Sequence, residues 1–169
     1  MAPPIFWITV QSCLIGAVSN LIAQAIRMQR DQAGLTFDWL NFSRFLLLTA
    51  ITCPPNYLWQ CALEAALPTS RHRIALTPTL AKLAIDQSVG AALNTIAYSY
   101  LLARLRGADS FTATQIASNE FWPLIVAGWS FWPFVSAASY FGFSSVAART
   151  RFASLAGLIW GVYLSLVTN

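Results

Sequence analysis

Apolar residues dominate this chain in long uninterrupted runs, and its few charged residues mostly lie between them. No Asp, Glu, Lys or Arg occurs in residues 1–26, 45–63, 121–148 or 152–169. About 20 apolar residues in a helix are enough to cross the roughly 30 Å hydrocarbon core of a bilayer. An ionised side chain in that core costs about 2.5–3.5 kcal/mol on insertion scales, so a membrane selects for such runs. The pattern predicts an all-α fold, an integral membrane bundle of four to five kinked helices.

The same pattern sets the expected bounds of the helices. We expect one domain over residues 1–169, because the length leaves no room for a separate soluble module of useful size. Helices are predicted over residues 4–30, 38–66, 78–106, 120–143 and 147–167, with a short interfacial segment over 110–120. The last two helices can be the arms of one region, so four crossings and five crossings both remain open.

Four prolines inside the apolar runs predict interruptions of the helices: Pro54, Pro55, Pro123 and Pro133. Each proline lacks a backbone N–H and clashes with the preceding turn, so it kinks or breaks a helix. In lipid, the carbonyl freed in this way must find a partner inside the protein. We therefore expect residues 121–148 to form a broken helix that packs against its neighbours.

A polar stripe runs along the first predicted helix. Gly16, Asn20 and Gln24 recur at intervals of four, which places them on one helical face. A small residue followed by two amides lets a neighbouring helix approach closely and form hydrogen bonds. The stripe is interpreted either as a helix–helix contact or as part of the polar lining of a pore.

Two charged residues lie inside the third predicted helix. Lys82 and Asp86 are four residues apart, so they share a face and are predicted to form an ion pair. Gln87 follows directly, and Asn94 adds a polar position further along. An ionisable residue within a membrane segment is a functional-site candidate by default. Asp86 is therefore either a pore-lining carboxylate or one half of an ion pair that orients neighbouring helices.

Composition supports a membrane protein and argues against several other classes. Charged residues make up 9% of the 169 residues and hydrophobic residues 57%, whereas a soluble domain has roughly 25% charged residues. The net charge of +4 is carried by arginine and suits lipid head groups. No basic run interleaved with aromatics predicts nucleic-acid binding. The expected partners are the lipid bilayer and other membrane proteins or further copies of the chain.

No catalytic, metal or cofactor site is expected. His72 is the sole histidine, and the three cysteines (Cys13, Cys53 and Cys61) form no C-x-x-C pair. A zinc site would need a local cluster of such ligands. The sequence also lacks a Ser/His/Asp or Cys/His arrangement and a glycine-rich phosphate loop. The chain is therefore not expected to be an enzyme.

Two patterns of spaced residues occur near the C-terminus: W-x-x-W-P at Trp129, Trp132 and Pro133, and R-x(10)-W-x-x-Y-L-S at Arg149, Trp160, Tyr163 and Ser165. Both resemble signatures of the Mpv17/PMP22 family of membrane proteins. Three upstream patterns are similar to those of the same family: G-x-x-x-D-x-x-x-Q at Gly16, Asn20 and Gln24, P-x-x-H-x-W at Pro54, Tyr57 and Trp59, and K-x-x-x-D-Q at Lys82, Asp86 and Gln87. Together the patterns cover nearly the whole chain.

Two departures from these patterns concern groups that can titrate. Asn20 stands where the family has aspartate, and Tyr57 stands where it has histidine. We therefore interpret the chain as a divergent member, of fungal type. The loss of one carboxylate and one histidine bears on any gating or titration role that the resemblance would otherwise imply.

The resemblance implies an all-helical protein of the mitochondrial inner membrane or, alternatively, of the peroxisomal membrane. Some members of the family are described as non-selective or weakly cation-selective channels for small solutes, and one fungal member has a structural task. Two hypotheses follow: a small pore, or a non-conducting structural or partner-binding membrane protein. A pore needs a continuous wet path that joins Asn20, Gln24 and Asp86, whereas a packed bundle does not.

Overall fold

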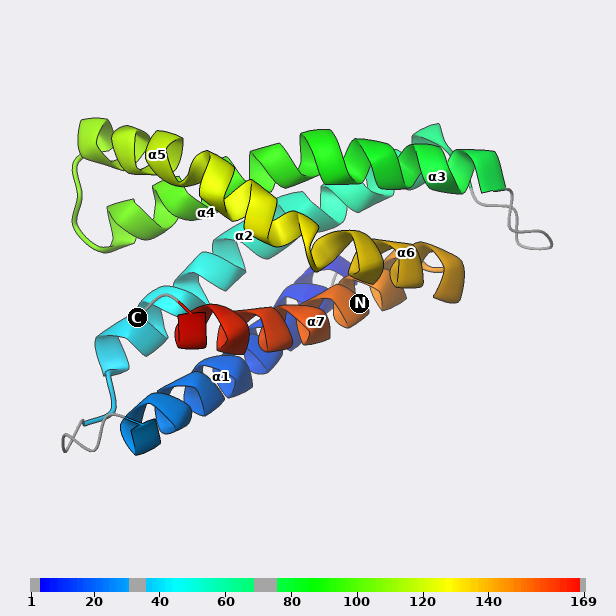
Figure 1. The fold of residues 1–169 in the computed structure, drawn as a ribbon. Helices are drawn as coiled ribbons and strands as arrows, with labels where there is room; N and C mark the ends of the chain where they lie inside the picture. The colour runs from blue at the N-terminus through cyan, green and yellow to red at the C-terminus, as the bar shows by residue number, and fades with distance from the viewer. Residues whose placement is uncertain (1–3, 31–35, 69–75, 168–169) are drawn as a thin grey trace.

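The computed structural model describes residues 4–30, 36–68 and 76–167, with the side chains of residues 30 and 164–167 left out. All the regular structure in this part of the chain is helical, so the predicted all-α class is confirmed (Figure 1). The elements are α1 (Pro4–Arg30), α2 (Trp39–Ala66), α3 (Leu76–Ile85), η1 (Asp86–Gly90), α4 (Ala91–Leu105), α5 (Ser110–Trp129), α6 (Trp132–Gly142) and α7 (Val146–Val167).

The first and last helices of the chain lie side by side. α1 packs against α7 along much of its length and also against α2, its neighbour in sequence (Figure 1). α4 and α5 form a second tight pair, and α2 connects the two pairs because it also contacts α4 and α7. α6 closes the arrangement by contacting α7 and α3. Helices far apart in the sequence therefore surround one common interior.

One long helical path runs from α3 through η1 into α4. η1 is a π-helical turn, a wider turn than the α-helix on either side of it. Its last residue, Gly90, is buried, and a Cβ atom added there would lie only 2.8 Å from the indole Nε1 of Trp59. The turn thus lets the indole of α2 approach the backbone of this path. Single π turns inside α-helices often mark functional sites.

The predicted segments 110–120 and 120–143 need correction. α5 begins at Ser110, because Asp109 caps its N-terminus, and it continues without a break through Pro123 to Trp129. The break comes at residues 130–131, and α6 leaves it bent by 53° from α5. The residues predicted as a separate interfacial segment are thus the first half of a long helix.

The interruptions predicted at the four prolines are found at one position and not at the other three. Pro54 and Pro55 lie inside the continuous helix α2, and Pro123 lies inside α5. Pro133 is in the first turn of α6, directly after the bend. A proline in the first turn of a helix loses no hydrogen bond, because the N–H there has no helical partner. The predicted interruption is therefore confirmed at Pro133, whereas the helix continues through the other three positions.

Burial in this fold differs from that in a typical soluble domain, because charged and polar side chains are buried while many large apolar ones are exposed. The largest fully buried side chains among the described residues are Arg149, Lys82, Thr79 and Ser99. Large apolar side chains stand exposed on every helix from α1 to α7, for example Leu14, Leu47, Leu93, Val126 and Ile159. By length and hydropathy, α1 can cross a membrane over Pro4–Gln29, and the bent pair α5–α6 also qualifies when it is counted as one segment.

Small residues permit the close approach of α1 to its two neighbours. A Cβ atom on Gly16 would lie 3.2 Å from the ring of Phe45 and 3.4 Å from the hydroxyl of Thr49, both on α2. On the other side of α1, a Cβ atom on Gly161 of α7 would lie 3.1 Å from the hydroxyl of Ser19. Gly16 therefore belongs to a helix–helix contact, as one of the two interpretations of the polar stripe proposed.

Replacing Gly16 by leucine is expected to destabilise the fold by about 1–3 kcal/mol, the usual cost of overpacking a close contact. Thermal unfolding of the purified protein in detergent, followed by tryptophan fluorescence, measures the loss. Gly142→Leu is the matched control, because a Cβ atom at Gly142 meets nothing within 4 Å. Equal losses in the two variants would contradict the assigned contact.

Acid is expected to loosen the start of α5. The backbone N–H of Thr112 donates a 2.7 Å hydrogen bond to the Asp109 carboxylate, and this bond lowers the pKa of Asp109 below its usual value. Because the pKa is lower in the folded state, the stabilisation is present above the unfolded pKa and is lost as pH falls through the folded one. Hydrogen-exchange protection of the Thr112 amide should therefore decrease as pH falls through the folded-state pKa of Asp109. Asp109→Asn keeps a capping side chain and should remove this pH dependence; an unchanged profile would contradict the cap.

Candidate functional site

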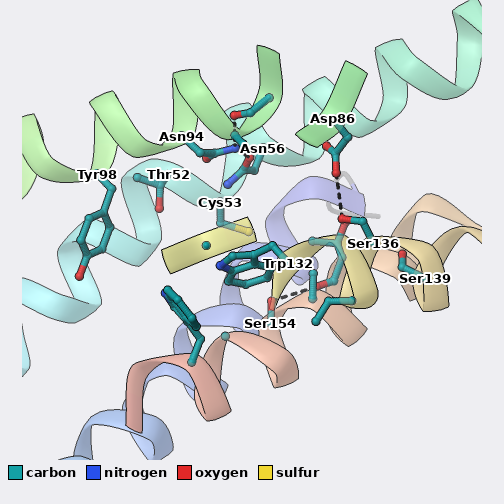
Figure 2. Close-up of a pocket in the computed structure, with 18 of the residues that line it drawn as sticks. Thr52, Cys53, Asn56, Asp86, Asn94, Tyr98, Trp132, Ser136, Ser139 and Ser154 are labelled. Atoms are coloured by element: carbon teal, nitrogen blue, oxygen red, sulfur yellow. Dashed lines mark hydrogen bonds between the residues drawn. The ribbon is translucent and has the colours of Figure 1, made fainter. Parts of the chain in front are cut away.

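A cavity of about 440 Å³ lies in the interior that the helices share. Its walls come from α1, α2, η1, α4, α5, α6 and α7, with Asn94, Tyr98 and Thr52 on one side and Ser154 on the other (Figure 2). The lining mixes apolar residues with hydroxyl, amide and charged groups, among them Asn56, Gln60, Asp86, Gln87, Ser136 and Arg149. Its size falls in the range of small-molecule sites.

Asp86 lies on the wall of this cavity and accepts four hydrogen bonds. One carboxylate oxygen accepts from Gln60 Nε2 at 2.8 Å and from the indole of Trp59 at 3.2 Å. The other oxygen accepts from Ser136 Oγ at 3.0 Å and from Gln87 Nε2 at 3.2 Å (Figure 2). Donors from α2, η1 and α6 thus hold one acidic group at the cavity.

The predicted pair between Lys82 and Asp86 is wrong. The ammonium of Lys82 lies 2.7 Å from the carboxylate of Glu64, at the end of α2. The Asp86 carboxylate instead accepts hydrogen bonds from donors on α2 and α6. Spacing within one helix shows which residues share a face, and it cannot show a stronger partner on another helix.

Glu64 serves a second cation. Arg149 of α7 places Nη1 2.5 Å from the same Glu64 oxygen that Lys82 contacts. The side chain of Lys82 is 0% exposed and that of Arg149 is 2% exposed. A buried charge that loses its partner is strongly destabilising. The shared carboxylate therefore ties α2, α3 and α7 together.

Tyr140 of α6 links this charge cluster to the cavity. Its ring lies below the guanidinium of Arg149, with 5.2 Å from Cζ to the ring centre, and 5.9 Å from the ammonium of Lys82. Its hydroxyl donates a 2.9 Å hydrogen bond to Gln60 Oε1, and Gln60 in turn donates to Asp86. Cations over an aromatic face are attracted by the negative face of the ring.

Three of the residues in this network were not singled out from the sequence: Glu64, Gln60 and Tyr140. The sequence features that could have indicated these residues are weak. Glu64 is the first charge after the charge-free run 45–63, and Lys82 is the only lysine of the chain. A lone carboxylate at the end of an apolar run needs a cationic partner, but the sequence offered several arginines besides Lys82 for that role.

Asn20 and Gln24 are buried but belong to a different region. Gln24 donates to Asn20 Oδ1 at 2.8 Å and to the backbone carbonyl of Asp38 at 3.1 Å. The backbone N–H of Asp38 donates to Gln24 Oε1 at 2.8 Å. The two amides thus fasten the start of α2 to α1. Neither residue lines the cavity that holds Asp86.

The remaining polar candidates, Gln87 and Asn94, do line the cavity. Asn94 donates a 2.7 Å hydrogen bond to Asn56 Oδ1 on α2 (Figure 2). Gln87 donates to Ser136 Oγ at 2.9 Å, while its own Oε1 is buried without a hydrogen-bond partner. The structure therefore brings three of the five predicted polar candidates together and places the other two elsewhere.

The tryptophans of the recognised patterns surround the same region. Trp59 donates to Asp86, and Trp129 donates a 3.0 Å hydrogen bond to the backbone carbonyl of Gln87. Trp160 stacks on Phe131 at 5.5 Å and on Tyr163 at 5.2 Å, and it meets Trp132 edge-on at 6.2 Å. These rings cover the bend between α5 and α6. The side chain of Ser165 lies outside the described residues, as does His72.

The described residues contain no group of three or more His, Cys, Asp or Glu side chains that could hold a metal ion. Cys13, Cys53 and Cys61 are free thiols. The polar groups that line the cavity include one carboxylate, one guanidinium, the Cys53 thiol and several hydroxyl and amide groups.

Comparison with known proteins gives one consistent picture. The profile of the Mpv17 / PMP22 family matches residues 103–165. The chain is 25% identical to the PXMP2/4 family protein 3 of Dictyostelium discoideum over 98% of its own length and 85% of that protein. It is 29% identical to the Mpv17-like protein of Bos taurus, over 81% of the chain and 67% of that protein. It is 32% identical to Protein SYM1 of Yarrowia lipolytica, over 52% and 43%. No solved structure matches.

Glu64→Ala is expected to destabilise the protein by about 3–5 kcal/mol, because it removes the carboxylate that Arg149 and Lys82 share. The unfolding temperature and the yield of monodisperse protein in detergent measure the effect. Glu120→Ala is the control, since this exposed glutamate is also on a helix but forms no ion pair within the described part of the chain. A loss no larger than that of the control would show that the cluster does not hold the fold.

Proposed function

We propose that the chain is an organelle membrane protein of the Mpv17/PMP22 type, which its matches to that family support, and that it forms a membrane-embedded helical bundle whose central cavity passes small solutes. The proposed passage is non-selective or weakly cation-selective. The role is not enzymatic, in keeping with the names of the relatives, which carry no catalytic activity.

The burial of charged side chains and the exposure of large apolar ones support the membrane part of this proposal. Exposed leucine, isoleucine and phenylalanine side chains would be unfavourable over so much of a surface in water, whereas lipid solvates them. Buried ionic and amide groups are then screened from the hydrocarbon by the helices that surround them. The proposed location is the mitochondrial inner membrane, with the peroxisomal membrane as the alternative, and the similarity to these relatives supports it.

The observation that carries the proposed passage is the polar cavity inside this apolar exterior. Its wall presents Asp86, a carboxylate that attracts cations, together with hydroxyls and amides that replace part of a hydration shell. Arg149 lines the same cavity and carries the opposite charge. A wall with both signs favours weak selectivity over strong selectivity.

A non-conducting structural role is the second candidate, and one observation favours it. Asn20 and Gln24, two of the polar residues that a pore was expected to use, are engaged in fastening α1 to the start of α2. Under this alternative the cavity is closed, and the exposed aromatic residues contact lipid or another membrane protein.

Recordings in planar bilayers separate the two candidates. We expect purified protein to give reproducible openings, and Asp86→Asn to shift the reversal potential toward lower cation preference. The amide keeps most of the shape of the carboxylate and removes its charge. Asp109→Asn is the matched control, because Asp109 is an exposed helix cap outside the cavity. It should leave selectivity unchanged.

A silent bilayer, from protein whose fold and insertion are verified by circular dichroism and protease protection, would reject the pore and leave the structural role. Openings whose ion preference is the same in wild type and Asp86→Asn would place the conducting path away from this cavity.

A further inference from the structure

We propose that the cavity binds a small oxyanion, a carboxylate or phosphate group, at the guanidinium of Arg149. Two of the three guanidinium nitrogens are engaged. Nε donates to the backbone carbonyl of Phe143 at 2.9 Å, and Nη1 donates to Glu64 at 2.5 Å. Nη2 is buried and has no hydrogen-bond partner among the residues that the structure describes.

This unpartnered nitrogen is unusual because of where it lies. The side chain of Arg149 is 2% exposed, yet the residue lines the 440 Å³ cavity. A buried donor on a charged group is costly to leave without an acceptor. The planar fork of arginine matches the geometry of carboxylate and phosphate oxygens. An oxyanion in the cavity is the ligand that completes this set of hydrogen bonds.

The rest of the wall limits the charge of that ligand. Ser139 of α6 also lines the cavity and carries a hydroxyl group (Figure 2). Asp86 lies on the same wall and repels anions, but its oxygens already accept four hydrogen bonds. A single oxyanion group therefore fits, whereas a polyanion would bring further charge against Asp86.

The inference names a ligand class for the cavity of the proposed function. It is tested by binding and not by current, so the two can fail separately. If the protein binds oxyanions but passes no current, the proposed passage is rejected and the oxyanion site stands. If it conducts but binds no oxyanion, the oxyanion site is rejected and the proposed passage stands.

The test is thermal unfolding of the full chain in a maltoside detergent, which carries no phosphate, followed by tryptophan fluorescence. Sodium phosphate and sodium acetate are titrated separately against sodium chloride at matched ionic strength. We expect a saturable rise in unfolding temperature with one or both oxyanions beyond that in chloride. The titrations are repeated with phosphatidylglycerol present. If the site takes a lipid phosphate, the lipid abolishes the rise in unfolding temperature that phosphate or acetate causes. If the site takes a soluble anion, the rise remains.

Two variants locate the binding. Arg149→Lys keeps the charge for Glu64 but loses the planar fork, and it should weaken binding at least about fivefold. Ala153→Leu fills the cavity one turn further along α7, leaves the ion pair in place, and keeps the test valid if the lysine variant does not fold. Arg151→Lys and Ala97→Leu are the controls, since both residues are exposed and neither lines the cavity.

The proposal is overturned if wild-type protein responds to phosphate and acetate no more than to chloride. It is also overturned if Arg149→Lys and Ala153→Leu bind as wild type does, because the oxyanion would then be held elsewhere. Weakened binding in these two variants, with wild-type binding in the two controls, establishes the site.

Discussion

The fold depends on one carboxylate that holds two buried cations. Glu64 at the end of α2 contacts Lys82 of α3 and Arg149 of α7, two side chains that are almost completely buried. In an apolar environment none of these charges can be left without a partner at low cost. The three helices therefore cannot slide past one another without separating opposite charges. This constraint fixes the register of elements that lie far apart in the sequence, a task that apolar contacts alone perform poorly in lipid.

The same cluster extends into the cavity through a chain of hydrogen bonds. Tyr140 packs its ring against both cations and donates to Gln60, which donates to Asp86. Such a chain of hydrogen bonds couples the positions of the groups that form it. The π turn is part of the arrangement, because Gly90 leaves room for the indole of Trp59 to reach Asp86. The charge cluster and the cavity are thus one structure, and a change in the first is expected to alter the second.

Much of the architecture follows from the hydrophobic pattern, whereas the partners of the polar groups do not. The bounds of α1, Pro4–Arg30, coincide with the predicted helix 4–30, because the charge-free run of residues 1–26 makes up most of it. A boundary near residue 120 was predicted from the sequence, because polar residues precede it and Pro123 follows it. In the structure one helix starts after the Asp109 cap and continues through Pro123 to Trp129. The partner of Lys82 was missed because spacing reports faces of one helix, and Glu64 approaches from another. A helix–helix contact at Gly16 was one of two interpretations of the stripe, because small residues let membrane helices approach closely, but its partner helix α2 could not be predicted from the spacing.

The polar groups of the interior fall into two sets, and the difference bears on function. Asn20 and Gln24 use their amides on each other and on the backbone of Asp38, so the fold itself accounts for them. Gln87 Oε1 and Arg149 Nη2 are buried beside the cavity and are left without partners by the fold. A buried polar atom without a partner lowers stability, so the needs of folding do not account for these two atoms. Their position on a cavity wall instead favours a role toward something that enters it. The sequence presents both sets as isolated polar residues in apolar helices, and only the arrangement of the helices separates those that hold the protein together from those that face a solute.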